Sequence, residues 1–360
     1  MDIALNIPLN NVSFGQTSFA LIKNLHKRNF NAKIFPIGNV DLSSQKVDND
    51  LGLWIKNSID QSLSSFSRKE KIFKLWHLMG SLESFSEKQV LMSFYELDSP
   101  TKQEINIVKN NYKTVFTSKY TCDIFKSAGC DNIQHIPLFF DKNNFNVKQK
   151  QYFQDGRITF NLVGKLEKRK NHKMVIQSWL KKYGNNPKYF LQCAIFNPFL
   201  KAEDQQNLIN SILEGKRYFN ISFLGFMESN ETYNDYLNSG DIIIGMSGGE
   251  GWGLPEFHSL ALGKHGVILN AHVYKDWANE ENACLVDSCG KIEAYDNMFF
   301  HKGAVTNQGN IYTFKEEDFI DACEKAIKRF ESNKINENGL KLQEEYTSDN
   351  TLSQILKLMD

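Results

Sequence analysis

The run Ser-Gly-Gly-Glu-Gly-Trp-Gly-Leu-Pro-Glu-Phe-His, from Ser247 to His258, carries the strongest structural signal in the sequence. It follows an apolar run at residues 242–246, which is typical of a buried strand, and Pro255 stands where a helix can begin. Glycines let a backbone approach a ligand closely, and the N-terminus of a helix attracts anions. The run therefore predicts a strand, a ligand-binding loop and a helix. A simple turn with Glu250 and Glu256 in solvent is the alternative.

A second run, from Val163 to Asn171, has similar surroundings. It follows apolar residues 158–163 and precedes a segment with helical spacing around residues 174–180. Lys165 ends the expected strand and Lys170 stands near the start of the expected helix, so the two cations could stabilise a departing diphosphate. Lys168 and Arg169 are expected to be solvated. A basic loop that is solvated throughout is the alternative.

The same alternation of strand and helix patterns extends outward over most of the chain and predicts an α/β fold with parallel sheets. A length of 360 residues suggests about two domains. We predict an N-terminal Rossmann-like domain at residues 1–145, a C-terminal one at 156–335, and a final helix within 340–360 that packs back on the first domain. The polar residues 141–155 are the expected linker. The expected strands lie at residues 3–8, 32–37, 73–78, 90–95, 114–117, 133–137, 158–163, 189–194, 221–224, 242–246 and 267–270.

Composition excludes a strong electrostatic partner. Lys and Arg number 42 and Asp and Glu number 42, so the net charge does not draw the protein to nucleic acid or to an anionic membrane. No apolar stretch is long enough to span a bilayer, and the first residues lack the pattern of a signal peptide. We therefore expect a soluble, cytoplasmic protein. Nothing in the sequence indicates its oligomeric state.

The two runs together resemble those of the retaining, family-four (group 1) glycosyltransferases with the GT-B fold. In that family a Gly-Arg pair at a strand end is followed, five residues after the Arg, by a Lys. Gly164, Lys165 and Lys170 match this pattern, with Lys165 in place of the Arg. The family also has a Glu-Gly-Phe-Gly-Leu-Pro run, and Glu250 to Pro255 reads Glu-Gly-Trp-Gly-Leu-Pro. The resemblance implies two Rossmann-like domains whose parallel sheets face each other across a cleft.

The resemblance also implies roles for residues in the second half. Lys165 and Lys170 would hold the donor diphosphate, and Glu250 would contact the donor sugar. The family's second Glu is replaced by His258, with Glu256 two residues earlier, so either His258 contacts the ribose or the donor preference changes. Further donor-binding residues are expected among the glycines and their neighbours, including the one glycine that remains in the first loop of the chain: Gly15, Gly164, Gly251, Trp252, Gly253 and Leu254.

Acceptor contacts are expected from the first half, where ligands lie outside the carboxyl ends of parallel strands. The candidates are His77, Tyr95, Glu96 and Asp98. A core histidine is the alternative for His77, and a surface loop is the alternative for Glu96 and Asp98.

The Asp48-Asn49-Asp50 run looks like a metal-binding Asp-x-Asp motif, but it opens an expected helix, where Asp48 is a suitable cap. We therefore expect no metal and no cofactor beyond the nucleotide-sugar donor, with a UDP-sugar as the expected donor. The resemblance implies a retaining hexosyltransferase that moves a glucose- or GlcNAc-type sugar to a hydroxyl of a glycan or glycolipid. Three alternatives remain: a phage-type DNA glycosyltransferase acting on a hydroxymethylated base, a sugar-nucleotide epimerase, and a catalytically silent nucleotide-binding protein.

Overall fold

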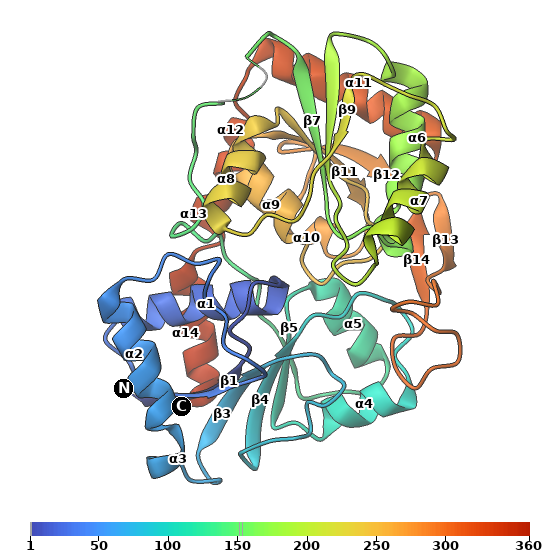
Figure 1. The fold of residues 1–360 in the computed structure, drawn as a ribbon. Helices are drawn as coiled ribbons and strands as arrows, with labels where there is room; N and C mark the ends of the chain where they lie inside the picture. The colour runs from blue at the N-terminus through green and yellow to red at the C-terminus, as the bar shows by residue number, and fades with distance from the viewer. Residues whose placement is uncertain (1, 151, 153) are drawn as a thin grey trace.

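The computed structural model describes residues 2–150, 152 and 154–360. The chain forms two six-stranded sheets in which every strand pairing is parallel (Figure 1). The first sheet has the order β2-β1-β3-β4-β5-β6 and the second has the order β12-β11-β10-β7-β8-β9. The expected α/β fold with two parallel sheets is confirmed.

The strands of the first sheet are β1 (Asp2–Ile7), β2 (Asn31–Pro36), β3 (Lys71–Leu75), β4 (Lys88–Ser93), β5 (Lys113–Phe116) and β6 (Ile133–His135). Those of the second sheet are β7 (Ile158–Val163), β8 (Tyr189–Ala194), β9 (Ile221–Phe223), β10 (Ile242–Gly245), β11 (His265–Asn270) and β12 (Cys284–Asp287). In each sheet the chain adds strands first on one side of the starting strand and then on the other. The order therefore switches once in each sheet, between β1 and β3 in the first and between β7 and β10 in the second. Parallel sheets bind ligands outside the carboxyl ends of strands at such a switch point.

Helices cover both faces of each sheet (Figure 1). The first half contains α1 (Ser13–Lys27), α2 (Asn49–Asp60), α3 (Ser62–Ser65), α4 (Lys102–Lys109) and α5 (Lys119–Ser127). The second half contains a 3-10 turn η1 (Lys168–Lys170) and the helices α6 (His172–Tyr183), α7 (Ala202–Ile212), α8 (Asn230–Ser239), α9 (Leu254–Ala261), α10 (Tyr274–Trp277), α11 (Glu316–Ser332), α12 (Glu337–Leu340) and α13 (Leu342–Glu345). No helix of the described residues is both long enough and apolar enough to cross a membrane.

The last helix, α14 (Ser348–Met359), returns to the first half, where it lies beside α1 and β3. The Thr351 hydroxyl donates to the carbonyl of Pro137 at 2.9 Å, and the Lys71 ammonium group donates to the carbonyl of Leu358 at 3.1 Å. The chain therefore crosses between the two halves twice. The domain boundaries given above stay a prediction.

The expected polar linker comprises residues 141–155, of which 151 and 153 lie outside the described residues. Residues 145–148 of this segment contact α8. Phe145 is buried and meets Tyr233 edge-on, with 5.8 Å between the ring centres. The backbone N–H of Lys148 donates to the side chain of Asn238 at 2.8 Å. These aromatic and amide contacts hold part of the segment in place, although its sequence has no helical or strand periodicity. Its role as the linker stays a prediction.

An antiparallel hairpin, β13 (Gly290–Glu293) and β14 (Asn310–Thr313), was not predicted. It follows β12 in the second half but contacts the first half: Lys291 pairs with Asp98 at 2.8 Å, and the backbone N–H of Asn310 donates to the same carboxylate at 2.8 Å. The buried side chains of Phe300 and Ile311 join the core that contains Tyr95 and Phe116. The hairpin thus ties the two halves together at one side.

Candidate active site

The second sheet presents two loops at its switch point. The loop after β7 contains Gly164 and Lys165 and leads into η1, while the loop after β10 is the glycine-rich run that leads into α9. Because β7 and β10 are paired neighbours, their carboxyl ends bring these two loops together. Both motifs that stood apart in the sequence therefore meet at one edge of the sheet, where a ligand is expected.

Lys170 and Glu250 form an ion pair across this edge, with the Lys170 ammonium group donating to Oε1 of Glu250. Both residues are buried, at 7% exposed each. Burial alone would raise the pKa of Glu250, but the charges of Arg169 and Lys170 outweigh that effect and hold its pKa below the ordinary value. Gly164 makes room for the lysine: a Cβ at Gly164 would lie 3.0 Å from Cε of Lys170. Glu250 is therefore an ionised carboxylate that accepts hydrogen bonds.

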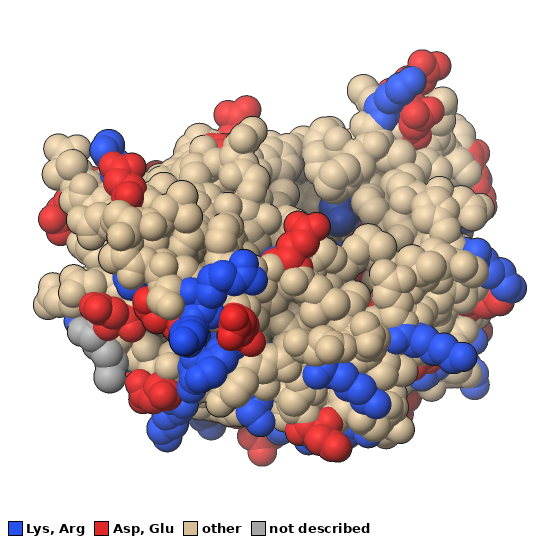
Figure 2. All heavy atoms as spheres, turned by 90° about the horizontal axis from the view of Figure 1, so that it is seen from below, with Lys and Arg blue, Asp and Glu red and all other residues tan. Residues whose placement is uncertain are grey.

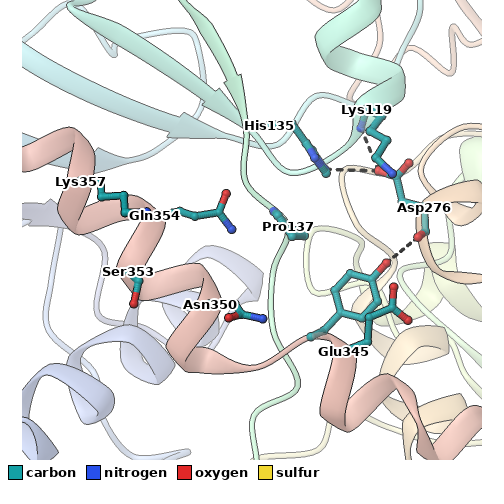
Figure 3. Close-up of a pocket in the computed structure, with 10 residues that line it drawn as sticks. Lys119, His135, Pro137, Asp276, Glu345, Asn350, Ser353, Gln354 and Lys357 are labelled. Atoms are coloured by element: carbon teal, nitrogen blue, oxygen red, sulfur yellow. Dashed lines mark hydrogen bonds and ion pairs between the residues drawn. The ribbon is translucent and has the colours of Figure 1, made fainter.

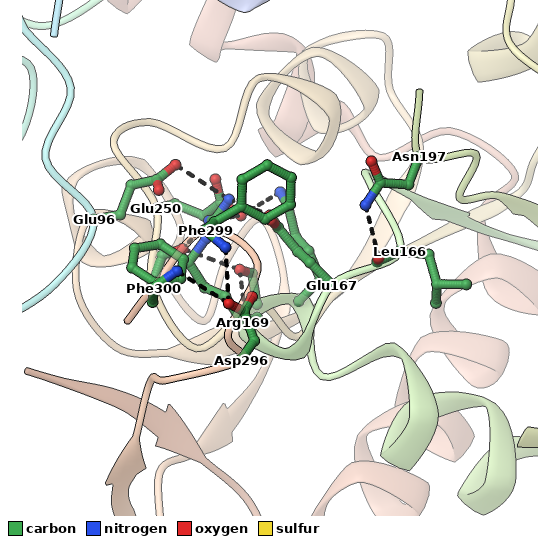
Figure 4. Close-up of polar contacts among 12 residues, drawn as sticks. Glu96, Leu166, Glu167, Arg169, Asn197, Glu250, Asp296, Phe299 and Phe300 are labelled. Atoms are coloured by element: carbon green, nitrogen blue, oxygen red, sulfur yellow. Dashed lines mark hydrogen bonds and ion pairs between the residues drawn. The ribbon is translucent and has the colours of Figure 1, made fainter. Parts of the chain in front are cut away.

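Arg169 lies at the centre of the charged cluster (Figure 4). It was expected to be solvated, and that expectation was wrong, because its side chain is 3% exposed. Its guanidinium group donates to Glu167 at 2.6 Å, lies 3.0 Å from Oε1 of Glu250 and also donates to the carbonyl of Gly249. It also lies 3.1 Å from Oε1 of Glu96, which belongs to the first half. Lys168, by contrast, is exposed as expected.

Lys165 lies beside aromatic rings. Its ammonium group is 4.5 Å from the centre of the Phe299 ring and 5.4 Å from that of Phe199. Among the described residues no carboxylate lies within ion-pair distance of it. Desolvation lowers the pKa of His77, and the charge of Lys165 lowers it further, which places this lysine toward the first half. Lys165 is thus a partly buried cation that can still pair with an anion.

The glycine-rich loop packs closely against the first half. A Cβ at Gly249 would lie 2.3 Å from the carbonyl oxygen of Glu96, and one at Gly251 would lie 2.5 Å from Cβ of Phe94. The Thr117 hydroxyl donates to the carbonyl of Gly251 at 2.5 Å. Gly249 and Gly251 belong to the loop that was expected to let a ligand approach closely. In the structure they also let the first half pack closely against this loop.

The other predicted donor residues of this loop are mostly enclosed. Trp252 is 2% exposed and packs edge-on against Phe257, so that only its backbone can face a ligand. Gly253 has a φ of 82°, in the left-handed region that favours glycine, and directly precedes Leu254, the first residue of α9. This backbone geometry turns the chain from the loop into the helix.

His258 is buried, at 5% exposed. Its ring stacks on Phe145 with 4.2 Å between the ring centres, and neither ring nitrogen has a hydrogen-bond partner in the described part of the chain. Burial lowers the pKa of His258 to about 3. Glu256, two residues earlier in the same helix, is also buried, and burial raises its pKa to about 7 although the charge of Lys170 lowers it. The expected ribose contact by His258 would require Phe145 to move.

The first-half candidates fall into two groups. His77 and Glu96 lie toward the second half, with His77 packed on Phe14 at 4.4 Å between ring centres. The side chain of Tyr95 instead lies in the core beside Phe125, and Asp98 is engaged by the β13–β14 hairpin. These two side chains do not lie open to an acceptor, because packing and hydrogen bonds already occupy them.

Gly15 lies in the first turn of α1 rather than in the loop before it. A Cβ there would lie 2.1 Å from the carbonyl oxygen of Asn10, so the glycine permits the loop to fold back on the helix. Asp48 caps α2 by accepting from the N–H of Leu51 at 2.8 Å, which confirms the expected capping role. Among the described residues, no group of His, Cys, Asp or Glu side chains is arranged to hold a metal ion.

A pocket of about 440 Å³ lies elsewhere, where the chain crosses between the halves (Figure 3). Asp276 from the second half accepts from the N–H of Lys119 at 2.8 Å and lies 3.6 Å from His135, both in the first half. These contacts join α10 to the start of α5. The pocket contains none of the residues predicted from the two motifs.

No protein-family model matches the sequence, and no curated protein matches it either. Solved structures do match. Sucrose-phosphate synthase from Thermosynechococcus elongatus is 12% identical, with a TM-score of 0.69 over 99% of this chain and 98% of that one. Alr3699/HepE from Anabaena, in complex with UDP and glucose, is 12% identical, with a TM-score of 0.69 over 99% of this chain and 98% of that one. WaaG, a glycosyltransferase involved in lipopolysaccharide biosynthesis, is 10% identical, with a TM-score of 0.61 over 98% of both chains.

These likenesses cover nearly the whole length of each chain. The chain therefore has the GT-B fold, and the expectation drawn from its two motifs is confirmed at the level of the fold.

Proposed function

We propose that this chain is a retaining glycosyltransferase that moves a glucose- or GlcNAc-type sugar from a UDP-sugar to a hydroxyl of a glycan or glycolipid. The observation that carries the proposal is the Lys170–Glu250 ion pair at the switch point of the second sheet, with Lys165 beside it. A diphosphate that develops charge as it leaves is stabilised by fixed cations. An ionised carboxylate next to these cations can accept hydrogen bonds from sugar hydroxyls.

The proposed reaction breaks the bond between the anomeric carbon of the donor and the oxygen of its terminal phosphate. The acceptor oxygen forms a bond to the same carbon on the same face, and the departing phosphate oxygen takes the acceptor's proton. The products are the glycoside and UDP. Lys165 and Lys170 offset the charge that grows on the diphosphate, while Glu250 holds the sugar. Because these cations supply the positive charge, the reaction is proposed to need no metal ion.

The first half is proposed to receive the acceptor. His77 and Glu96 lie at the carboxyl ends of β3 and β4, opposite the second sheet's charged loops. The similarity to a structure holding UDP and glucose supports the UDP-sugar donor, and the similarity to a glycosyltransferase of lipopolysaccharide biosynthesis supports a glycan or glycolipid acceptor.

A DNA acceptor has less support. On the face drawn in Figure 2, acidic and basic side chains are interspersed, and the formal net charge of the chain is +0. A protein that binds the phosphate backbone of DNA gains most of its affinity from clustered Lys and Arg. Tighter binding of a DNA duplex than of a neutral glycan at physiological salt would favour the DNA acceptor.

A thermal-shift screen with UDP-, GDP- and ADP-glucose tests the proposal. A ligand that binds the native state stabilises it by about 2.7 kcal/mol at a hundredfold excess over Kd, so UDP-glucose should raise the Tm by about 4 °C. NMR of the product of a transfer reaction should show the anomeric configuration of the donor, and EDTA should leave the rate unchanged.

No shift with any of these nucleotides would contradict the proposal. Conversion of the donor sugar without an acceptor would indicate an epimerase. Binding with neither transfer nor hydrolysis of the donor would indicate a silent nucleotide-binding protein.

A further inference from the structure

Three carboxylates converge on one guanidinium group. Glu96, Glu167 and Glu250 lie at 3.1, 2.6 and 3.0 Å from the nitrogens of Arg169, and Lys170 contacts only one of them, Glu250. The carboxylates therefore outnumber the two cations that they touch. This cluster lies at the switch point where the donor diphosphate is proposed to bind, and a diphosphate would add further negative charge.

Glu96 differs from the other two carboxylates. It comes from the first half, and its side chain is 34% exposed, against 2% for Glu167 and 8% for Glu250. Within the described residues, the Glu96 carboxylate forms one ion pair, and its partner is Arg169. Of the three carboxylates it is the one that can leave Arg169 without opening the second half.

Glu96 also lies near the cation that lacks a carboxylate partner. Desolvation raises the pKa of Glu96, Arg169 opposes that effect, Glu250 and Glu167 add to it, and the charge of Lys165 lowers the pKa as well. The carboxylate is thus within the electrostatic reach of both Arg169 and Lys165. A position near two cations is one that a phosphate group would also take.

We infer that the Glu96 carboxylate and a donor phosphate compete for Arg169, which makes Arg169 a third cation of the donor site. This inference rests on the function proposed above. The Arg169–Glu96 ion pair is then one of the contacts between the two halves, and a phosphate replaces the carboxylate in it. Released from Arg169, Glu96 remains at the end of β4, on the side where the acceptor is proposed to bind.

Isothermal titration of UDP into the wild-type protein, Glu96→Gln and Asp98→Asn tests the inference. Gln keeps the shape of Glu and can still accept from Arg169, but it carries no charge that repels a phosphate. We expect Glu96→Gln to bind UDP about three- to fivefold more tightly than the wild type, a change in the range that one partly exposed ion pair contributes.

Asp98→Asn is the matched control, because Asp98 belongs to the same segment and also joins the two halves, yet its partners are Lys291 and Asn310 in the hairpin. Its UDP affinity should stay within about twofold of the wild type. An equal gain in Asp98→Asn would show that looser closure, and not competition, is responsible, and would overturn the inference.

An unchanged or weaker UDP affinity in Glu96→Gln would also overturn it. That failure is distinct from a failure of the proposed function, since in this case the wild type still binds UDP. A wild type that binds no UDP would overturn both. Glu96→Asp keeps the charge on a shorter side chain and should bind UDP less tightly than Glu96→Gln, which provides a second comparison if the Gln variant is unstable.

Discussion

Gly249 and Glu96 approach each other so closely that a Cβ on Gly249 would lie 2.3 Å from the carbonyl oxygen of Glu96. Gly249 belongs to the glycine-rich loop of the second half, and Glu96 follows β4 of the first half. The absence of a side chain at this position is therefore what lets the two halves close over the charged cluster. This contact is between backbones, so no flexible side chain can move aside to relieve a clash.

Gly249→Ala should hold the halves apart by the width of a methyl group. A misplacement of about 1 Å in an active site lowers turnover by about a hundredfold, so we expect a fall in kcat of this order, measured with a UDP-sugar and its acceptor. Small-angle X-ray scattering should show a larger radius of gyration. Gly225→Ala is the control, since nothing lies within 4 Å of a Cβ there. A Gly249→Ala variant as active as Gly225→Ala would contradict the closure argument.

Lys170→Ala should lower kcat by about a hundredfold or more, because removal of one preorganised group that stabilises developing charge has this effect. Glu250 would keep Arg169 as a partner at 3.0 Å, so the variant should remain folded. The initial rate of UDP release measures the effect.

Lys168→Ala provides the matched control for this lysine. Lys168 lies in the same 3-10 turn, but it is exposed, and within the described part of the chain its ammonium group donates to the carbonyl of Tyr295 alone, at 3.0 Å. Equal rates for Lys168→Ala and Lys170→Ala would remove the reason to assign the diphosphate to this turn.

The sequence predicted the parts of the site that depend on local order. A strand, a glycine-rich or basic loop and a helix follow one another at both motifs, and parallel pairing of β7 with β10 brings Lys170 to Glu250. Arg169 could not be placed in this way, because its partners Gly249 and Glu96 lie far from it in the chain. An arginine between two lysines is hydrophilic by its sequence, so hydropathy predicts that it is exposed to solvent. The tertiary structure brings three carboxylates to Arg169, and these ion pairs compensate for its burial.

The β13–β14 hairpin and the contacts of residues 145–148 with α8 were not predicted, for a different reason. Every residue of β13 is exposed, so the strand has no apolar alternation to detect. Phe145 stands alone in a polar segment, and its contact with His258 depends on the placement of α9. Isolated contacts of this kind leave no periodic pattern in a sequence.

Arg169→Lys should destabilise the protein although it keeps the charge. A lysine cannot reproduce the planar fork that reaches Glu167, Glu250 and Gly249 together. Carboxylates left buried without their partner destabilise a protein by about 3 kcal/mol or more, and urea unfolding should show a lower midpoint. An unchanged midpoint would mean that the cluster is hydrated and that Arg169 is not its centre.

The buried histidines predict the pH dependence of stability. Burial lowers the pKa of His258 and of His172 to about 3 and that of His272 to about 4, against an ordinary value of 6.5. Below pH 6.5 the unfolded chain binds protons at these sites and the folded chain does not, so the contribution of these histidines to the free energy of unfolding falls as the pH falls. Each histidine should contribute a loss of about 1 kcal/mol between about pH 6.5 and about pH 5.5.

His258→Phe isolates one of these contributions. Phe fits beside Phe145 and removes two ring nitrogens that have no hydrogen-bond partner among the described residues, so the variant should be at least as stable as the wild type at pH 7. Because Phe does not titrate, its urea midpoint should fall less than that of the wild type when the pH is lowered. Parallel losses in both proteins would show that His258 is protonated in the folded state and reaches solvent. In that case His258 could contact a ribose in the present arrangement, without displacement of Phe145.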